Sequence, residues 1–97
     1  MEKKKKVEII AGYVEFQKVL DVVDAMDLKY TFLSSIAGKG AHGLKEHDTF
    51  FSVLKNSYLI AVCSEKQAKE IEDKINPLLK QFGGILIITD CMATKNK

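Results

Sequence analysis

Residues 58–89 read YLIAVC, then SEKQAKEIEDKINPLLKQFGG, then ILIIT, and this stretch decides the fold. Residues 58–63 are apolar without alternation, which is typical of a strand in the middle of a sheet with both faces covered. Ser64 follows at once with Gln67 three residues later, which is the spacing of a capping box at a helix start. Residues 85–89 are a second unalternating apolar strand. The stretch therefore predicts a strand, a helix and a strand in succession.

The middle piece carries apolar residues at every third or fourth position, so they share one face of a helix. These residues are Ala68, Ile71, Ile75, Leu78, Leu79 and Phe82. Pro77 lacks a backbone N–H, so we expect the helix to kink or restart near Asn76. Gly83 and Gly84 are expected to end it.

The N-terminal half of the chain begins in a similar way. Residues 6–13 are β-branched and partly alternating, which predicts a strand. Residues 14–27 carry an apolar stripe at helical spacing, which predicts a helix packed on one side. Residues 29–36 predict a second strand, and residues 37–48, with their glycines, a short flexible loop. A strand beginning within residues 48–54 is one option beyond the loop, with residues 55–57 as a turn or a bulge.

The predicted order is strand, helix, strand, strand, helix, strand. This is the ferredoxin-like βαββαβ arrangement of the α+β class, with an antiparallel sheet and two helices on one of its faces. We expect a single domain over residues 1–97. A chain of this size buries a modest core, which favours association into an oligomer.

Charge separates several function classes. The 15 basic residues are all lysines, against 13 acidic residues, for a net charge of +2. Four of the lysines form the run at residues 3–6, and we expect residues 1–5 to be a disordered basic lead-in. The rest of the chain is slightly acidic, and it lacks the arginines that read bases and phosphates. The predicted central strands also lack the aromatic pattern of RNA readers. Nucleic acid is therefore not an expected partner.

Hydropathy and cysteine usage indicate the compartment. No apolar run reaches the length of a membrane span, and the N-terminus does not resemble a signal peptide. We therefore expect a cytoplasmic protein without direct membrane insertion. Cys63 and Cys91 lie on apolar segments without metal-ligand spacing, which predicts buried free thiols.

Catalytic chemistry is not supported by the residues present. His42 and His47 lie near the glycine loop with no nucleophile at a fixed spacing, so we predict no catalytic residues and no enzyme. The two histidines, with nearby carboxylates, leave a metal site open as a weaker alternative.

The glycine loop is the most informative motif. Gly38-Lys39-Gly40-Ala41-His42-Gly43 satisfies G-x-G-x-x-G, but no helix start follows, as a dinucleotide-binding turn would require. Glycines expose backbone amides that can point at an anion, and Lys39 adds a positive charge beside them. The loop is therefore either an anion site or a plain flexible connection.

Three features together resemble the PII-like signalling proteins. They are Tyr30-Thr31 at the start of the second strand, the Gly38-Lys39-Gly40 turn, and the corner from Phe82 to Ile85. The resemblance is greatest to the short-loop branch associated with carbon and bicarbonate sensing. It implies a homotrimer that needs no cofactor and binds an adenine nucleotide of the AMP, ADP or ATP class as an effector, in clefts between subunits. The nucleotide-binding residues that it implies are Ile36, Ala37, Gly38, Lys39, Gly40, Phe82, Gly83, Gly84 and Ile85.

The resemblance also implies a partner, either a membrane-transporter subunit or a metabolic enzyme, that is regulated through a nucleotide-dependent loop. The chain departs from the full-length family pattern in three ways. Its loop is short and has no tyrosine to modify, it lacks C-terminal arginines that grip phosphates, and the strand before Gly38 is one residue longer, which predicts a bulge or a displaced turn. The alternative is a metal-binding trimer of the divalent-ion tolerance type, with His42 and His47 as ligands.

Overall fold

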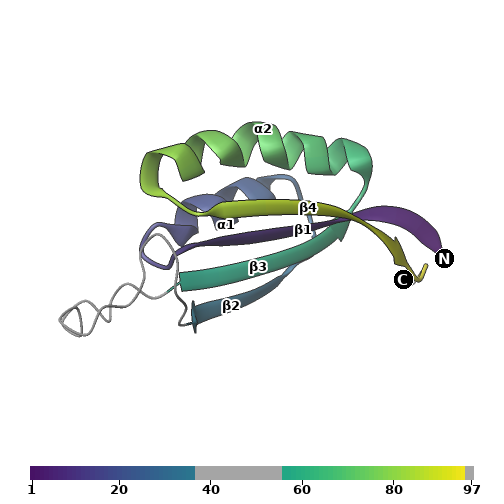
Figure 1. The fold of residues 1–97 in the computed structure, drawn as a ribbon, viewed down its shortest axis with the longest axis horizontal. Coiled ribbons are helices and arrows are strands. Elements are labelled where there is room, and N and C mark those ends of the chain that lie inside the picture. The colour runs from purple at the N-terminus through teal and green to yellow at the C-terminus, as the bar shows by residue number, and fades with distance from the viewer. Residues whose placement is uncertain (37–55, 96–97) are drawn as a thin grey trace.

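The computed structural model of the chain describes residues 1–36 and 56–95. The elements are β1 (Glu2–Gly12), α1 (Phe16–Ala25), β2 (Thr31–Ile36), β3 (Asn56–Cys63), α2 (Glu65–Phe82) and β4 (Ile85–Ala93). The described strands pair antiparallel in the order β2-β3-β1-β4. Both helices lie on the same face of the sheet, as Figure 1 shows. This confirms the predicted ferredoxin-like βαββαβ fold, with β1 and β3 as its central strands.

The core lies between the helices and one face of the sheet. Alternate residues of β1 and β3 point into it, as the twofold period of a strand requires. The apolar stripes of α1 and α2 cover them. The buried apolar residues are Val7, Ile9, Ala11, Phe16, Val19, Val23, Leu59, Ala61, Cys63, Ala68, Ile71, Ile75 and Leu79.

The other face of the sheet is not covered by any described helix or strand of the chain. β3 alternates between buried and more accessible residues, although its sequence predicts that both faces are covered. β4 is an edge strand whose residues alternate between half-buried and exposed, except at Thr89 and Asp90, which are both exposed. The prediction of two covered faces for β3 is therefore wrong for the single chain, because both described helices pack on the same side.

The predicted disordered lead-in over residues 1–5 is wrong. The lysine run lies inside β1, which pairs with β4 as far as Glu2 opposite Ala93. Carboxylates compensate part of its charge: Lys4 Nζ lies 3.5 Å from Glu2 Oε1, and Lys5 is paired with Asp90. Backbone hydrogen bonds to β4, which is distant in sequence, therefore order a segment that is polar by composition.

The second helix begins as predicted. The Gln67 N–H donates to Ser64 Oγ at 3.1 Å, and the Ser64 N–H donates to Gln67 Oε1 at 3.0 Å, which completes a capping box. The helix then runs without a restart through Pro77, which is exposed. Ile75 and Leu79 are buried on either side of the proline, and their packing holds the helix across the missing hydrogen bond.

Several predicted boundaries shift. The first helix is shorter than residues 14–27, and the second strand begins at Thr31. The sequence predicts a turn or a bulge at residues 55–57. The turn is wrong for the described residues, because Asn56 and Ser57 open β3 and pair with Gly12 and Ala11. The predicted bulge is confirmed in kind, since the register between β2 and β3 shifts between Leu33 and Ile36. None of the helices in the described ranges has both the length and the apolar character needed to span a membrane.

Candidate functional site

The predicted nucleotide site falls at one end of the sheet. Ile36 ends β2 and pairs with Asn56, which in turn pairs with Gly12 at the end of β1. Ile85 opens β4 at the same end and pairs with Ile10. Ile36 and Asn56, which flank residues 37–55 in the sequence, and the corner at residues 82–85 therefore lie toward a common end of the molecule, on the left in Figure 1.

The described residues of this site, Ile36 and the corner at residues 82–85, lie toward opposite edges of the sheet. β2 and β4 are the edge strands, with β3 and β1 between them. Three spacings between neighbouring strands separate the edges by roughly 14 Å. Ile36 and the corner at residues 82–85 are therefore not adjacent within the sheet of one chain.

The glycine corner is built for close packing. Gly83 caps α2 with φ 90°, and its N–H donates to the Leu79 carbonyl at 2.7 Å. Gly84 has φ +136°, and a Cβ there would lie 2.7 Å from the Ile10 carbonyl oxygen and 2.9 Å from Leu79 Cδ2. Only glycine fits this approach of the corner to β1 without strain. The corner therefore has a structural reason for its glycines, whatever else it binds.

The residues on either side of the glycines differ in accessibility. Phe82 ends α2 and packs against the core, and Lys18 Nζ lies 6.0 Å from the centroid of its ring. Ile85 is 56% exposed at the start of β4. Ile85 therefore offers an open apolar surface at this end, whereas the Phe82 ring is half-buried between the two helices.

The remaining predicted residues lie outside the described ranges. They are Ala37, Gly38, Lys39 and Gly40 of the glycine turn, together with His42 and His47 of the alternative metal site. Within residues 1–36 and 56–95, no three His, Cys, Asp or Glu side chains gather where they could hold a metal ion.

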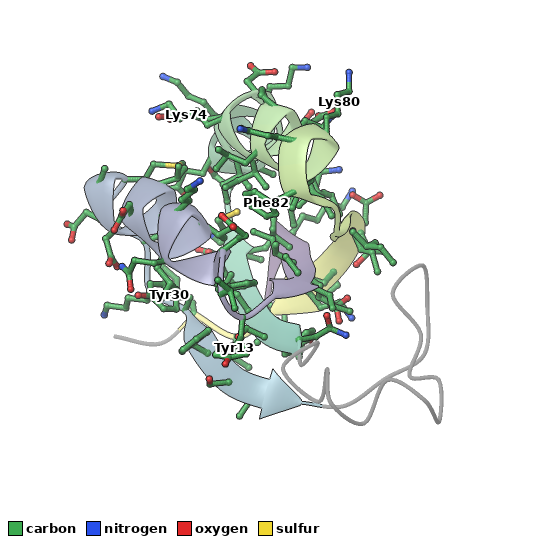
Figure 2. All side chains as sticks on the ribbon, turned by 90° about the vertical axis from the view of Figure 1, so that its left-hand side faces the viewer. Tyr13, Tyr30, Lys74, Lys80 and Phe82 are labelled. Atoms are coloured by element: carbon green, nitrogen blue, oxygen red, sulfur yellow. The ribbon has the colours of Figure 1, made fainter. Side chains whose placement is uncertain are left out.

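Sequence reasoning missed residues in the turn between β1 and α1. Tyr13 and Val14 are 39% and 68% exposed, and they follow β1 at the same end of the sheet as the glycine corner. Lys18, near the start of α1, reaches the Phe82 ring. Figure 2 looks onto this end and shows Tyr13 below Phe82. The sequence predicts Tyr13 as the last residue of a strand, so only the fold brings it to the site.

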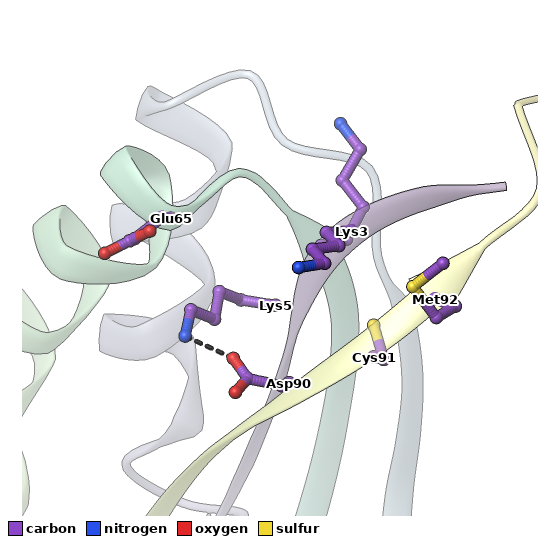
Figure 3. Close-up of a pocket in the computed structure, with 7 residues that line it drawn as sticks. Lys3, Lys5, Glu65, Asp90, Cys91 and Met92 are labelled. Atoms are coloured by element: carbon purple, nitrogen blue, oxygen red, sulfur yellow. Dashed lines mark hydrogen bonds and ion pairs between the residues drawn. The ribbon is translucent and has the colours of Figure 1, made fainter.

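Cavities occur at the other end and along one side of the molecule. One of about 470 Å³ lies between the start of α2 and the outer ends of β1 and β4, as Figure 3 shows, and another of about 450 Å³ runs between α2 and β4. Neither contains a predicted nucleotide residue. The first is lined by Lys3, Lys4, Lys5, Glu65, Asp90, Cys91 and Met92.

An ion pair dominates the electrostatics of the first cavity. Lys5 Nζ donates to Asp90 Oδ1, and this hydrogen bond raises the pKa of the Lys5 ammonium and lowers the pKa of the Asp90 carboxyl. Glu65 further favours the charged lysine, and Lys3 the charged aspartate. The lining holds three lysines and two carboxylates, so their charges cancel in part and this cavity has the character of a solvated ion-pair surface.

The solved structures most informative for this chain share its fold. CPII of Thiomonas intermedia K12, a nitrogen regulatory PII-like protein bound to ADP, AMP and bicarbonate, superposes with a TM-score of 0.76 at 24% identity, covering 93% of this chain and 87% of CPII. CPII bound to ADP and bicarbonate gives 0.75 at 23% identity, with 93% and 87% covered. A PII-like signalling protein of Thermus thermophilus gives 0.68 at 19% identity, with 92% and 86% covered. No curated protein sequence matches the chain.

The sequence itself matches one protein family. Residues 4–96 fit the family described as Nitrogen regulatory protein P-II, which includes the lysine run from Lys4 onward as well as both halves of the predicted site. The family comprises signalling regulators, so the prediction that the chain is not an enzyme is confirmed with the predicted family. The chain belongs to the PII family.

Proposed function

We propose that this protein is a homotrimeric PII regulator that binds an adenine nucleotide of the AMP, ADP or ATP class between neighbouring subunits. The phosphates would contact Ile36, Ala37, Gly38, Lys39 and Gly40 through backbone amides and the Lys39 ammonium. The corner of Phe82, Gly83, Gly84 and Ile85 would border the base or the ribose. The similar fold of CPII, whose structures hold ADP and AMP, supports this ligand class.

The observation that supports the proposal is that Ile36, which precedes the glycine turn in the sequence, and Ile85 of the glycine corner lie on opposite edge strands at one end of the sheet. A second subunit whose β4 edge lies beside the first subunit's β2 edge would bring a corner and a glycine turn together. The site is then complete only in the oligomer, which accounts for a cleft between subunits rather than within one.

The uncovered face of the sheet supports the oligomer. It carries apolar side chains from three strands around the Tyr58–Glu8 hydrogen bond, and Leu33 and Val62 are 51% and 47% exposed there. Ile85 and Ile87 of β4 lie on the same face. Exposed apolar side chains gathered on one sheet face are typical of an interaction surface. Burial against two further copies would also explain why the sequence of β3 is apolar on both faces.

Regulation would act through segment 37–48. A nucleotide that contacts Lys39 and its neighbours in one arrangement of the segment, and not in another, shifts the population toward the first. The surface offered to a partner would change with it. The expected partner is a transporter subunit or a metabolic enzyme.

Calorimetric titration with AMP, ADP and ATP, with the mass of the oligomer measured in the same buffer, tests the proposal. We expect saturable binding at one nucleotide per subunit of a trimer. Lys39→Ala should weaken the binding of AMP more than the binding of adenosine. Lys66→Ala is the control, because it removes a lysine from the start of α2, away from the glycine corner, and it should change the affinity for neither ligand. A wild-type protein that binds none of the nucleotides but takes up zinc through His42 and His47 would overturn the nucleotide proposal in favour of the metal alternative.

A further inference from the structure

Tyr13 is held at the proposed nucleotide end by its backbone. The Phe16 N–H donates to the Tyr13 carbonyl at 3.3 Å, and the Glu15 N–H donates to the Gly12 carbonyl at 3.2 Å. These bonds fix the turn between β1 and α1. Because β1 is a central strand, Tyr13 emerges between the β2 edge and the β4 edge, at the end of the sheet seen in Figure 2.

The three tyrosines of the chain differ in their hydrogen bonds. The Tyr30 hydroxyl donates to Asp24 at 2.8 Å, and the Tyr58 hydroxyl donates to Glu8 at 2.7 Å. Among the residues described, Tyr13 makes no side-chain hydrogen bond, and 39% of it is exposed. Of the three tyrosines, Tyr13 is therefore the one whose side chain can contact a ligand without losing a hydrogen bond to a described residue.

The surroundings of Tyr13 suit a flat apolar group. Val14, its neighbour, is 68% exposed, and Ile85, which opens β4 opposite Ile10 at the same end of the sheet, is 56% exposed. A Cβ added to Gly12 would meet no atom of the described residues within 4 Å. Two other aromatic residues are described at this end, but Phe16 is buried and stacks on Phe32, and the Phe82 ring packs on the core with Lys18 above it. Of these three described rings, Tyr13 is the one with a face available to a ligand.

We propose that Tyr13 is the residue on which the purine base of the bound nucleotide stacks. The inference rests on the proposed nucleotide function and assigns the base to a side chain that neither the family match nor the glycine motif singles out. An aromatic ring binds the π-face of a base with little sequence or charge requirement. Stacking would also supply affinity that a site without arginine cannot draw from bidentate phosphate contacts.

The first test compares AMP binding by wild type, Tyr13→Phe and Tyr13→Leu. Tyr13→Phe keeps the ring and should bind AMP within about twofold of wild type. Tyr13→Leu keeps apolar bulk without the ring and should weaken AMP roughly 5- to 150-fold, the range of one base-stacking contact. Adenosine should weaken by the same factor, since the contact is to the base. Circular dichroism and oligomer mass show whether the Leu variant keeps the fold.

The second test measures the tyrosine fluorescence of the wild-type protein as AMP is added. The chain has no tryptophan, and hydrogen bonds to carboxylates quench the emission of Tyr30 and Tyr58. Tyr13 should therefore give most of the tyrosine emission. Saturating AMP should quench it under excitation at the red edge of the tyrosine band, where adenine absorbs little. Tyr13→Leu should emit less at the start and show no further change with AMP.

The outcomes separate the two proposals. The role of Tyr13 is overturned if Tyr13→Leu binds AMP as well as the wild type does and AMP does not quench the fluorescence of the wild type. The nucleotide function would still stand in that case. A wild-type protein that binds no nucleotide overturns both. An equal loss in Tyr13→Phe and Tyr13→Leu would overturn stacking in favour of a hydroxyl contact.

Discussion

Gly84→Ala gives a direct measure of how tightly the glycine corner packs on β1. The added Cβ would lie 2.7 Å from the Ile10 carbonyl oxygen, 2.9 Å from Leu79 Cδ2 and 3.0 Å from Ala11 Cβ. Ile10 is bound on both sides, to Tyr58 of β3 and to Ile85 of β4, so its carbonyl cannot move without disturbing the sheet. The change must therefore strain the backbone, the packing, or both.

The loss of stability in Gly84→Ala is the sum of two costs, one from the backbone and one from packing. At φ +136°, an alanine backbone costs about 1–3 kcal/mol. Overpacking a site that cannot relax costs about 1–3 kcal/mol more. We therefore expect the free energy of unfolding to fall by about 2–6 kcal/mol, out of the roughly 5–15 kcal/mol typical of a domain. At this chain length each kcal/mol lowers Tm by about 4–8 °C, so Tm should fall by about 8 °C or more.

Urea unfolding followed by circular dichroism measures the effect, with all variants at one protein concentration because assembly adds to stability. Gly12→Ala is the matched control, since its Cβ meets no atom within 4 Å, and it should change the free energy of unfolding by less than about 1 kcal/mol. A Gly84→Ala variant that is as stable as Gly12→Ala, and that loses only nucleotide binding, would refute the packing argument and make Gly84 a ligand-access residue alone.

Three further perturbations test other parts of the fold. Tyr58→Phe should weaken assembly of the proposed oligomer, because it removes the hydrogen bond to Glu8 in the middle of the exposed sheet face. It should also change how stability depends on pH in the alkaline range. That hydrogen bond raises the pKa of Tyr58 in the folded protein. The stability that the bond contributes is therefore complete below the pKa of an unfolded tyrosine and is lost as the pH rises through the folded pKa of Tyr58. Thermal melts across alkaline pH would measure this loss in the wild type and its absence in Tyr58→Phe. Ser57→Ala should raise the free energy of unfolding by about 1 kcal/mol in denaturant titration, since the buried Ser57 hydroxyl has no partner among the described residues; a loss of stability would show that it does have one. Cys91→Ser leaves Cys63 as the only thiol, and a chromogenic disulfide reagent should react with it only on unfolding, because burial raises its pKa and excludes the reagent; rapid reaction of the folded variant would contradict this.

The elements that the sequence predicts well are those fixed by neighbours in the chain. The capping box of Ser64 and Gln67 sets the start of α2 within a single turn, and the glycines at 83 and 84 set its end. The strand and helix order follows from periodicity, and the order then limits the topology to a familiar arrangement. Local signals of this kind need no knowledge of what lies across the sheet.

The elements that it predicts poorly depend on distant partners. The lysine run becomes a strand because β4 supplies backbone partners and Asp90 a carboxylate. The polar composition of Asn56 and Ser57 predicts a turn, yet β1 lies opposite them. Composition therefore fails where pairing at long sequence separation outweighs local preference.

The candidate site divides in the same way. The sequence predicts the glycine corner as part of a ligand site, and the structure adds that Gly84 must also be glycine for packing against Ile10. The presence of the glycines alone is then weak evidence for a ligand. Tyr13 carries no motif and is indistinguishable in sequence from a strand end, but its accessibility sets it apart once the fold is known.

Assembly and ligand binding are linked by the same feature of this fold. One face of the sheet is covered by helices and the other carries exposed apolar side chains, which the proposed oligomer would bury. The proposed site would also need a partner copy, because Ile36, which precedes the glycine turn in the sequence, and Ile85 of the glycine corner lie on opposite edge strands. Tyr13 stands between the edges on a central strand, where it can serve a cleft that either neighbour completes. A nucleotide that bridges two copies therefore binds the oligomer in preference to the single chain, and it must stabilise the oligomer by the free energy of that difference.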